Sequence, residues 1–245
     1  MIIAVGNQKG GVGKSNLVTN LGYRLSNAGY QVLIIDLDTQ GHQAICLGME
    51  KAPDLTKWLG HGEPIHRVAT PTGRPNLDVI RSDSSTADLK TTLAGRRFSE
   101  FILTRALAAP NRYDYILIDC APSMDNLLVA ALMAADYLII PARMDQLSMD
   151  GLAEILDSLS DLQQFESRCK LAAIIPTFFN KSIKESFIQL QNLAGSFGGQ
   201  VWPPIPQDSK IPVSNREGLT IFEYAPSSRS ASAYTQITDK LLELL

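Results

Sequence analysis

The sequence predicts a doubly wound α/β fold, a mainly parallel β-sheet flanked by helices, from three observations. Short apolar runs recur along the chain, they lack the period-two alternation of half-exposed strands, and helical patterns lie between them. The runs are residues 2–5, 32–35, 77–80, 115–118, 138–140 and 171–175, and the clearest helical patterns cover residues 14–28 and 148–165. In such a fold the ligand site lies at the carboxyl ends of the strands.

The composition is that of an ordinary folded protein. Apolar residues make up 45% of the 245 residues and charged residues 19%, and no low-complexity or linker-like run interrupts the chain. We therefore expect a single domain over residues 1–245. The chain opens on a strand-like run without a basic leader, its apolar runs are shorter than the ~20 residues of a membrane span, and its three cysteines are scattered. These features predict a cytoplasmic protein.

The first predicted strand runs into a glycine-rich loop and then into the first predicted helix. The loop, residues 7–15, reads Asn-Gln-Lys-Gly-Gly-Val-Gly-Lys-Ser, and this strand–loop–helix context is typical of a phosphate-binding loop. Its glycines let successive backbone N–H groups converge on phosphate oxygens at the positive end of the helix dipole. Lys14 is expected to bridge the β- and γ-phosphates of ATP, and the Ser15 hydroxyl to ligate Mg²⁺. The predicted nucleotide-binding residues here are Gly10, Gly11, Val12, Gly13, Lys14, Ser15 and Asn16.

Acidic residues follow two later strands. Asp36 and Asp38 stand two residues apart at the carboxyl end of the second run and point the same way, which places them near the nucleotide. Asp119 follows the hydrophobic run at residues 115–118, which is the Walker B form, and we expect it to hold Mg²⁺ through water. Three motifs in this order predict metal-assisted phosphoryl transfer.

The phosphate loop departs from the general P-loop pattern at one position. Gln8 stands where the first glycine is expected, and a second lysine, Lys9, follows it. This arrangement resembles the deviant Walker A motif that is shared by ParA, MinD, the nitrogenase iron protein and arsenical pump ATPases. The segments that resemble ParA are residues 7–11, 36–40, 119–122, 135–141, 151–152, 205–208 and 224–234. The chain is thus similar to ParA-type partition ATPases over nearly its whole length, in a short form without the N-terminal helix-turn-helix.

The resemblance implies a role for each motif residue. Lys9 is expected to reach across an ATP-sandwiched homodimer to the phosphates of the other subunit, and Asp38 to position or activate the attacking water. Asp36 is expected in the outer shell of the metal or, alternatively, as a carboxylate that stabilises its own loop. Thr39 replaces the proline that is usual in ParA. The predicted catalytic residues are therefore Lys9, Lys14 and Asp38, the metal-site residues Ser15, Asp36 and Asp119, and the adenine-side residues Asn180, Pro206, Gln207 and Asp208.

The charge of the chain is unevenly distributed. Residues 1–167 carry 14 Lys/Arg and 19 Asp/Glu, whereas residues 168–245 carry 8 and 6. A surface for nucleic acid is therefore expected toward the carboxyl-terminal third. The residues predicted to contact DNA phosphates without sequence preference are Lys181, Lys184, Lys210, Arg216 and Arg229. The resemblance further implies an ATP-bound homodimer on nucleoid DNA, slow intrinsic hydrolysis, and stimulation by a ParB-like adaptor that links the cycle to a plasmid, chromosome or other cargo.

Three alternative functions share these motifs. The first is a MinD-like ATPase that cycles on membranes, but residues 238–245 hold one lysine between two acids and lack the cationic face of a membrane helix. We therefore expect no membrane partner. The second is a P-loop amide-forming synthetase, which needs a carboxylate substrate. The third is a scaffold that binds ATP only to close a dimer.

Overall fold

The computed structural model describes residues 1–244, of which residues 146–150 are described without their side chains. Within this part of the chain a seven-stranded sheet has the order β3-β4-β2-β5-β1-β6-β7, and every strand pair is parallel except β3 with β4. The strands are β1 (Ile2–Val5), β2 (Val32–Asp36), β3 (Thr70–Pro71), β4 (Leu77–Ile80), β5 (Tyr115–Asp119), β6 (Tyr137–Arg143) and β7 (Lys170–Thr177). The predicted doubly wound, mainly parallel sheet is confirmed.

The predicted apolar runs coincide with the parallel strands because these strands are buried on both faces. All five residues of β2 and of β5 are buried, so neither strand alternates between apolar and polar positions. The short strand β3 was not predicted. It is two residues long, lies at the edge of the sheet and contains Pro71. Proline has no N–H to donate, and an edge strand tolerates this because one of its sides has no partner strand.

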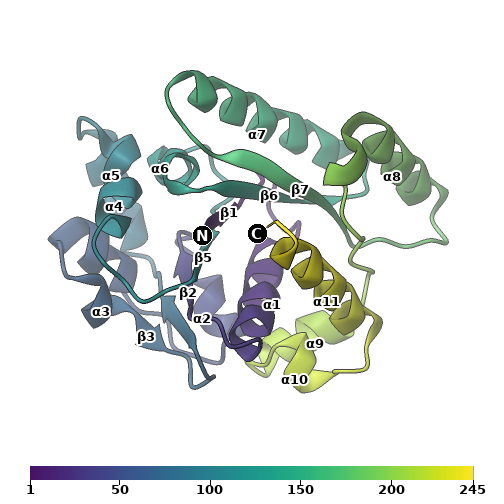
Figure 1. Cartoon of the computed structure of the whole chain (residues 1–245), viewed down its shortest axis with the longest axis horizontal. Helices are drawn as coiled ribbons and strands as arrows, with labels where there is room; N and C mark the ends of the chain where they lie inside the picture. Colours follow the sequence, from purple (N-terminus) through teal and green to yellow (C-terminus); the bar gives the residue numbers. More distant parts are fainter. Residues whose placement is uncertain (245) are drawn as a thin grey trace.

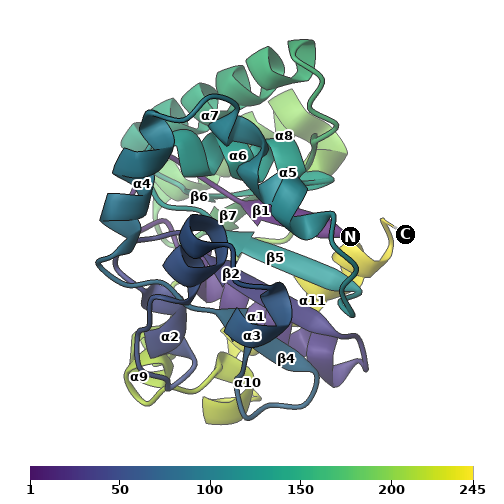
Figure 2. The same ribbon diagram turned by 90° about the vertical axis from the view of Figure 1, so that its left-hand side faces the viewer.

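The helices cover both faces of the sheet (Figures 1 and 2). Among the larger ones, α1 and α11 lie on one face, and α6 and α7 lie on the other. The α-helices are α1 (Lys14–Asn27), α2 (His42–Cys46), α3 (Ile65–Val68), α4 (Thr86–Ala94), α5 (Ile102–Leu107), α6 (Asn126–Ala134), α7 (Gln146–Gln164), α8 (Lys184–Phe197), α9 (Lys210–Arg216), α10 (Ile221–Tyr224) and α11 (Arg229–Leu242). A π-helical turn, η1 (Thr56–Gly60), and two 3-10 turns, η2 (Ser99–Phe101) and η3 (Gly198–Gln200), complete the helical elements.

Two apolar layers form the core, one on each face of the sheet. Successive residues of one strand enter opposite layers: Leu33 and Ile35 of β2 pack with α4 to α7, whereas Val32 and Ile34 pack with α1 and α11. Burial of a side chain such as Ile34 contributes about 1.5–3 kcal/mol. The two layers hold the strands rigidly, so that their carboxyl ends present a fixed edge.

The carboxyl ends of three central strands meet at one place. In the parallel register, Val5 of β1 and Asp36 of β2 are both paired with Asp119 of β5. The chain continues from β1 toward β2 on one side, while β6 lies on its other side, so this edge is the topological switch point of the sheet. The phosphate loop, Asp36 and Asp119 are therefore brought together by sheet topology alone.

Candidate nucleotide-binding site

The loop between β1 and α1 has the backbone geometry of a phosphate cradle. Gly11 and Gly13 have φ angles of +70° and +94°, which side chains other than glycine rarely adopt. The loop is fixed from β7, because Thr177 Oγ1 donates to the carbonyl oxygen of Val12 at 2.8 Å. The loop is also fixed to β6, because the buried loop residue Asn7 donates its Nδ2 to the carbonyl oxygen of Pro141 in that strand at 2.9 Å. The backbone of this loop is thus held in a defined shape.

Lys14 is the buried cation of this loop and is only 7% exposed. Its Nζ donates to the carbonyl oxygens of Asn7 and Lys9, both at 3.0 Å. Burial lowers the pKa of Lys14, and the negative charges of Asp119 and Asp38 oppose that effect. The lysine therefore lies at the centre of the loop, with its ammonium group beside the carboxylates.

Asp119 has the environment that a metal site at this edge requires. It is 1% exposed, and burial raises its pKa, although the hydrogen bond from Gln43, the nearby Ser15 hydroxyl and the charge of Lys14 lower it. Its Oδ2 accepts from Gln43 Nε2 at 2.8 Å, whereas its Oδ1 is buried and has no hydrogen-bond partner within the described residues. An acceptor oxygen left without a donor fits Mg²⁺, directly or through a bound water.

Asp36 and Asp38 have different surroundings, although they stand two residues apart. Asp36 is fully buried, and its two oxygens accept the backbone N–H groups of Asp38 and Gln43 at 2.9 and 3.0 Å. Burial raises its pKa well above the ordinary range, and the charge of Asp119 adds to this. Asp36 thus anchors its own loop, which is the alternative that the sequence left open. Asp38 instead lines the hollow beside the phosphate loop.

Two adjoining hollows form the site. The larger, of 680 Å³, lies between the phosphate loop, the loop at residues 38–42 and the segment 121–123 that follows Asp119. The smaller, of 240 Å³, lies between α1, the end of β7 and α9. Of the predicted residues, the larger contains Gly10, Gly11, Gly13, Lys14, Ser15, Asn16 and Asp38, and the smaller contains Gly13, Asn16, Pro206, Gln207 and Asp208. Gly13 and Asn16 border both hollows, so a nucleotide bound in the larger can extend into the smaller.

Val12 and Asn180 lie outside these linings. Val12 is fully buried, and its backbone carbonyl oxygen accepts the hydrogen bond from Thr177. Asn180 Oδ1 accepts the backbone N–H of Ser182 at 3.0 Å, so the side chain closes a turn before α8. Asp208 does line the smaller hollow, and its Oδ2 accepts from Ser230 Oγ at 3.0 Å, which joins the loop before α9 to α11.

Lys9 lies at the rim of the phosphate loop and faces the junction of β6 and α7. Its Nζ lies 3.1 Å from Asp145 Oδ1, and Arg143 Nε lies 3.2 Å from Asp145 Oδ2. The Arg143 guanidinium in turn stacks on the ring of Phe178, 4.7 Å from the ring centroid. In this conformation Lys9 therefore has a partner within its own chain.

The predicted DNA-contacting residues are all exposed. Lys210 and Arg216 belong to α9, and Arg229 begins α11. Lys181 and Lys184 lie at the start of α8, which is separated from α9 and α11 (Figures 1 and 2). Within the described residues, none of the five forms an ion pair. They are therefore available to an anionic surface as two groups rather than one cluster.

The structure adds residues that sequence reasoning missed. Gln43 connects Asp119, Asp36 and the start of α1, and Lys90 of α4 both lines the larger hollow and pairs with Asp125 at 2.8 Å. Phe178, with a strained φ of +52°, borders both hollows. The only local sequence signal among them is the position of Gln43 shortly after the Asp-x-Asp segment.

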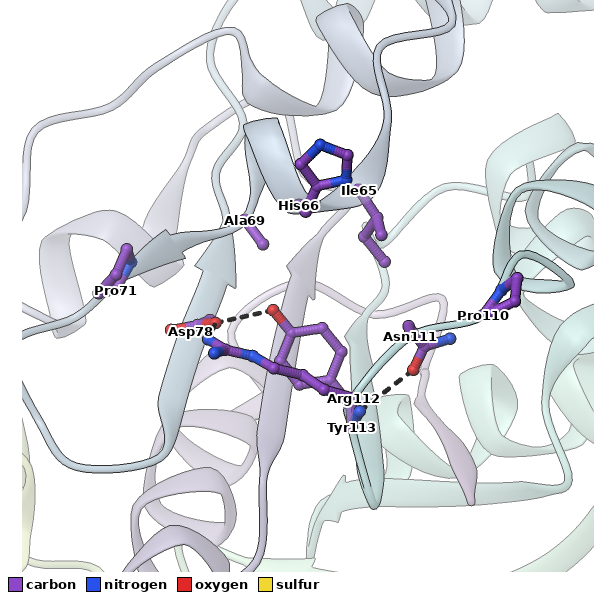
Figure 3. Close-up of a pocket in the computed structure, with 9 residues that line it drawn as sticks. All are labelled: Ile65, His66, Ala69, Pro71, Asp78, Pro110, Asn111, Arg112 and Tyr113. Carbon is purple, nitrogen blue, oxygen red and sulfur yellow. Dashed lines mark hydrogen bonds and ion pairs between the residues drawn. The ribbon is translucent and has the colours of Figure 1, made fainter.

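A separate hollow of 540 Å³ lies near the amino-terminal ends of β4 and β5 (Figure 3). There Arg112 Nη2 and the Tyr113 hydroxyl donate to the buried Asp78 Oδ2 at 2.5 and 2.7 Å. His66 of α3 lies across the hollow from them. None of the residues predicted from the sequence lines this hollow, and its buried carboxylate is occupied by side chains of the chain itself.

The described residues contain no cluster of three or more His, Cys, Asp or Glu side chains suited to a metal ion. Mg²⁺ in nucleotide sites needs no such cluster, because it keeps several waters and binds substrate phosphates. Nor does any helix in the described part of the chain have both the length and the apolar character needed to cross a membrane.

Comparison with known proteins identifies the family. A family described as an AAA domain matches residues 1–172. The chromosome-partitioning ATPase Soj of Thermus thermophilus is 30% identical, over 98% of this chain and 94% of its own. The cell division protein PomZ of Myxococcus xanthus is 34% identical, over 98% of this chain and 77% of its own. This chain belongs to the ParA/MinD family of P-loop ATPases.

A solved structure extends the likeness to the carboxyl-terminal helices. The cobyrinic acid a,c-diamide synthase of Mycobacterium smegmatis, with bound ADP and magnesium, has a TM-score of 0.84 and 29% identity, and the match covers 99% of this chain and 94% of that one. The ParA-type resemblance of the sequence motifs is thus confirmed at the level of the family. Since the likeness runs past residue 172, it includes α9 to α11 beside the smaller hollow.

Proposed function

We propose that this chain is a ParA-type positioning ATPase that binds ATP with Mg²⁺, closes into a homodimer around two nucleotides and then binds double-stranded DNA without sequence preference. The observation that carries the proposal is a hollow lined by the P-loop lysine and a water-side carboxylate. A second lysine lies at the rim of the same loop, and Asp119 beside it has a buried oxygen without a partner in the described residues. The name of the Thermus relative, a chromosome-partitioning ATPase, supports it. The chain would act in the cytoplasm, on nucleoid DNA.

The chemistry assigned to the site is hydrolysis of the terminal phosphate bond of ATP. A water oxygen bonds to the γ-phosphorus, the bond from that phosphorus to the bridging oxygen breaks, ADP leaves, and the proton of the water ends on solvent or phosphate. Asp38 accepts a hydrogen bond from the water and holds it in line. Lys14 exchanges its two backbone acceptors for phosphate oxygens, and the N–H groups of residues 10–13 hold the chain of phosphates.

The metal fits beside Ser15 and Asp119. Mg²⁺ would neutralise charge on the phosphates when bound. The Ser15 hydroxyl and the free Oδ1 of Asp119 are the oxygens that would hold it, directly or through water, while Asp36 fixes the loop behind them. Lys9 would leave Asp145 and contact the phosphates of the second subunit, so that neither site is complete in a monomer.

The cycle would be slow until a partner acts. Asp38 is the only side chain assigned to the water, and an absent transition-state partner is worth about 10³–10⁵ in rate in phosphoryl transfer. A ParB-like adaptor that stimulates hydrolysis would return the chain to an ADP-bound monomer and release it from DNA. Repetition of that release around an adaptor-coated plasmid, chromosome or other cargo would move or position the cargo.

The experiment is DNA affinity against salt, with oligomeric state measured in parallel by light scattering. ATP should convert the wild type to a dimer, and the logarithm of its DNA affinity should fall linearly with the logarithm of salt concentration. Lys9→Ala should bind ATP but stay monomeric. The double variant Lys184→Glu/Arg216→Glu should dimerise but lose most DNA affinity and part of the salt slope.

The matched control is Arg67→Glu/Arg105→Glu. It makes the same change in charge at two exposed arginines on α3 and α5, away from α8, α9 and α11. This control should keep most of the DNA affinity. A flat salt dependence, equal losses in both double variants, or a monomeric wild type with ATP would refute the proposal.

A second candidate function is amide formation, because a diamide synthase shares 29% identity and the whole fold. Such an enzyme activates a carboxylate with ATP and transfers nitrogen to it, so it hydrolyses little ATP in the absence of a carboxylate substrate. Phosphate release by the purified chain with ATP, Mg²⁺ and DNA alone distinguishes the two. Turnover under those conditions supports the positioning ATPase, and turnover only after addition of a carboxylate and a nitrogen donor supports the synthetase.

A further inference from the structure

Gln43 is a fully buried glutamine of α2 that contacts three segments of the site. Its Nε2 donates to Asp119 Oδ2 at 2.8 Å and to the carbonyl oxygen of Ser15 at 3.1 Å. Its backbone N–H donates to Asp36 Oδ2 at 3.0 Å. One residue therefore joins the carboxyl ends of β2 and β5 to the first turn of α1.

The orientation of the Gln43 amide is fixed by its surroundings. Thr19 Oγ1, itself buried, donates to Gln43 Oε1 at 2.8 Å. The carbonyl oxygen of Ser15 and the carboxylate of Asp119 are acceptors, so only the NH₂ end of the amide can face them. Both donors and the acceptor of the side chain are therefore used, and a buried network without unpaired members is rigid.

This arrangement determines how Asp119 is presented to the site. Gln43 holds the carboxylate by Oδ2, and Oδ1 is left buried with no partner in the described part of the chain. Groups behind a metal ligand orient it and fix which oxygen is free, and their loss commonly costs 10–100-fold in metal affinity. Gln43 stands only five residues after Asp38. One short segment therefore carries both the carboxylate assigned to the water and the residue that holds Asp119.

We propose that Gln43 is a positioning residue for Mg²⁺–ATP, acting through Asp119 and the start of α1. It fixes Asp119 relative to Ser15, the other residue assigned to the metal, and it ties both to the loop that carries Asp38. This inference rests on the ATP and Mg²⁺ binding of the proposed function, and it is independent of the DNA and dimer steps.

The test compares ATP affinity with and without Mg²⁺, read from the fluorescence of a labelled ATP analogue, so that no turnover is needed. Gln43→Met keeps the length of the side chain and removes its donor and acceptor. In EDTA the variant should bind within about twofold of wild type, whereas the gain in affinity on adding Mg²⁺ should fall by about 10-fold or more. Thr19→Val, which leaves Gln43 in place but frees its amide, should show a smaller loss in the same direction.

The matched control is Gln163→Met. Gln163 is exposed on α7 and donates its Nε2 to a backbone carbonyl, that of Cys169 at 2.7 Å, far from the phosphate loop. It should retain the full gain from Mg²⁺. The proposal is overturned if Gln43→Met keeps that gain, or if it loses affinity equally with and without Mg²⁺, as a general loss of structure would produce.

Two further outcomes also decide the question. If Gln43→Met does not fold, Thr19→Val gives the answer, and an unchanged gain in that variant contradicts the proposal. If the wild type binds no ATP at all, the proposed function fails first and this inference with it. The two failures are distinguishable because the first appears in the variants alone and the second appears in the wild type.

Discussion

Replacement of Asp38 by asparagine tests the water-side role most directly. Asp38 Oδ1 accepts the backbone N–H of Gln40 at 3.0 Å, and its own N–H donates to Asp36. The asparagine side chain keeps an oxygen for the Gln40 contact, so the loop should retain its shape. The substitution removes the negative charge of the side chain and its ability to accept a proton from water.

The expected magnitude follows from that loss. A positioned general base contributes about 10²–10⁴ in rate, which corresponds to about 2.7–5.4 kcal/mol of barrier. ATP affinity should not fall, because the lost charge repels the phosphates and the loop remains pinned by Asp36 and by the Ser82 hydroxyl, which donates to the Asp38 carbonyl oxygen. Asp38→Asn should therefore bind ATP as tightly as wild type and persist as an ATP-bound dimer.

The assay is a single turnover of γ-labelled ATP, with nucleotide affinity measured separately. Asp83→Asn is the matched control: Asp83 Oδ1 accepts the N–H of Ser85 at 2.9 Å in a similar turn, but the residue lies outside the nucleotide hollows. That variant should hydrolyse ATP at the wild-type rate. If Asp38→Asn also hydrolyses within about threefold of wild type, the water-positioning role is wrong.

Two further predictions concern the phosphate loop and the pH dependence of stability. Lys14→Ala removes the buried ammonium that we propose binds the phosphates, and it should abolish binding of a fluorescent ATP analogue; wild-type affinity would contradict this role. Burial would raise the pKa of Glu223, but hydrogen bonds from Arg74 and Thr220 outweigh it and hold the pKa below the ordinary 4.5. The stability that Glu223 adds is therefore complete above that pH and is lost as pH falls through the folded-state pKa. The Tm difference between wild type and Glu223→Gln should shrink in acid, and a difference that stays equal at about pH 7 and about pH 3 would refute this.

The fold was predictable because its signal is local. Strands such as β2 and β5 are buried on both faces, so their apolar runs are visible in the sequence without knowledge of their neighbours. The phosphate loop was predictable for the same reason, since its glycines and lysines all lie within a segment of nine consecutive residues. The edge strand β3 has two residues and no apolar run, so nothing local marks it.

Parts of the site were hidden because they depend on contacts between distant segments. The bond from Gln43 to Asp119 joins residues 76 apart, and the one from Thr177 to Val12 joins residues 165 apart. The position of Gln43 shortly after the Asp-x-Asp segment is a local signal, but a glutamine in a five-residue helix does not reveal which partners it contacts. The sequence left two roles open for Asp36, and only the positions of two backbone N–H groups favour the loop-anchoring one.

The ion pair of Lys9 can be weighed against the role that the family resemblance gives this lysine. Its side chain and that of Asp145 are 29% and 37% exposed, and ion pairs of this kind contribute about 0–1 kcal/mol. A hydrogen bond from an ammonium group to a charged acceptor contributes about 1.5–3 kcal/mol, and more where water is excluded. Asp145 would keep Arg143 as a partner after Lys9 leaves. Exchange of Asp145 for a phosphate of a second subunit would therefore stabilise the proposed dimer, and the contact within the chain would oppose it only weakly.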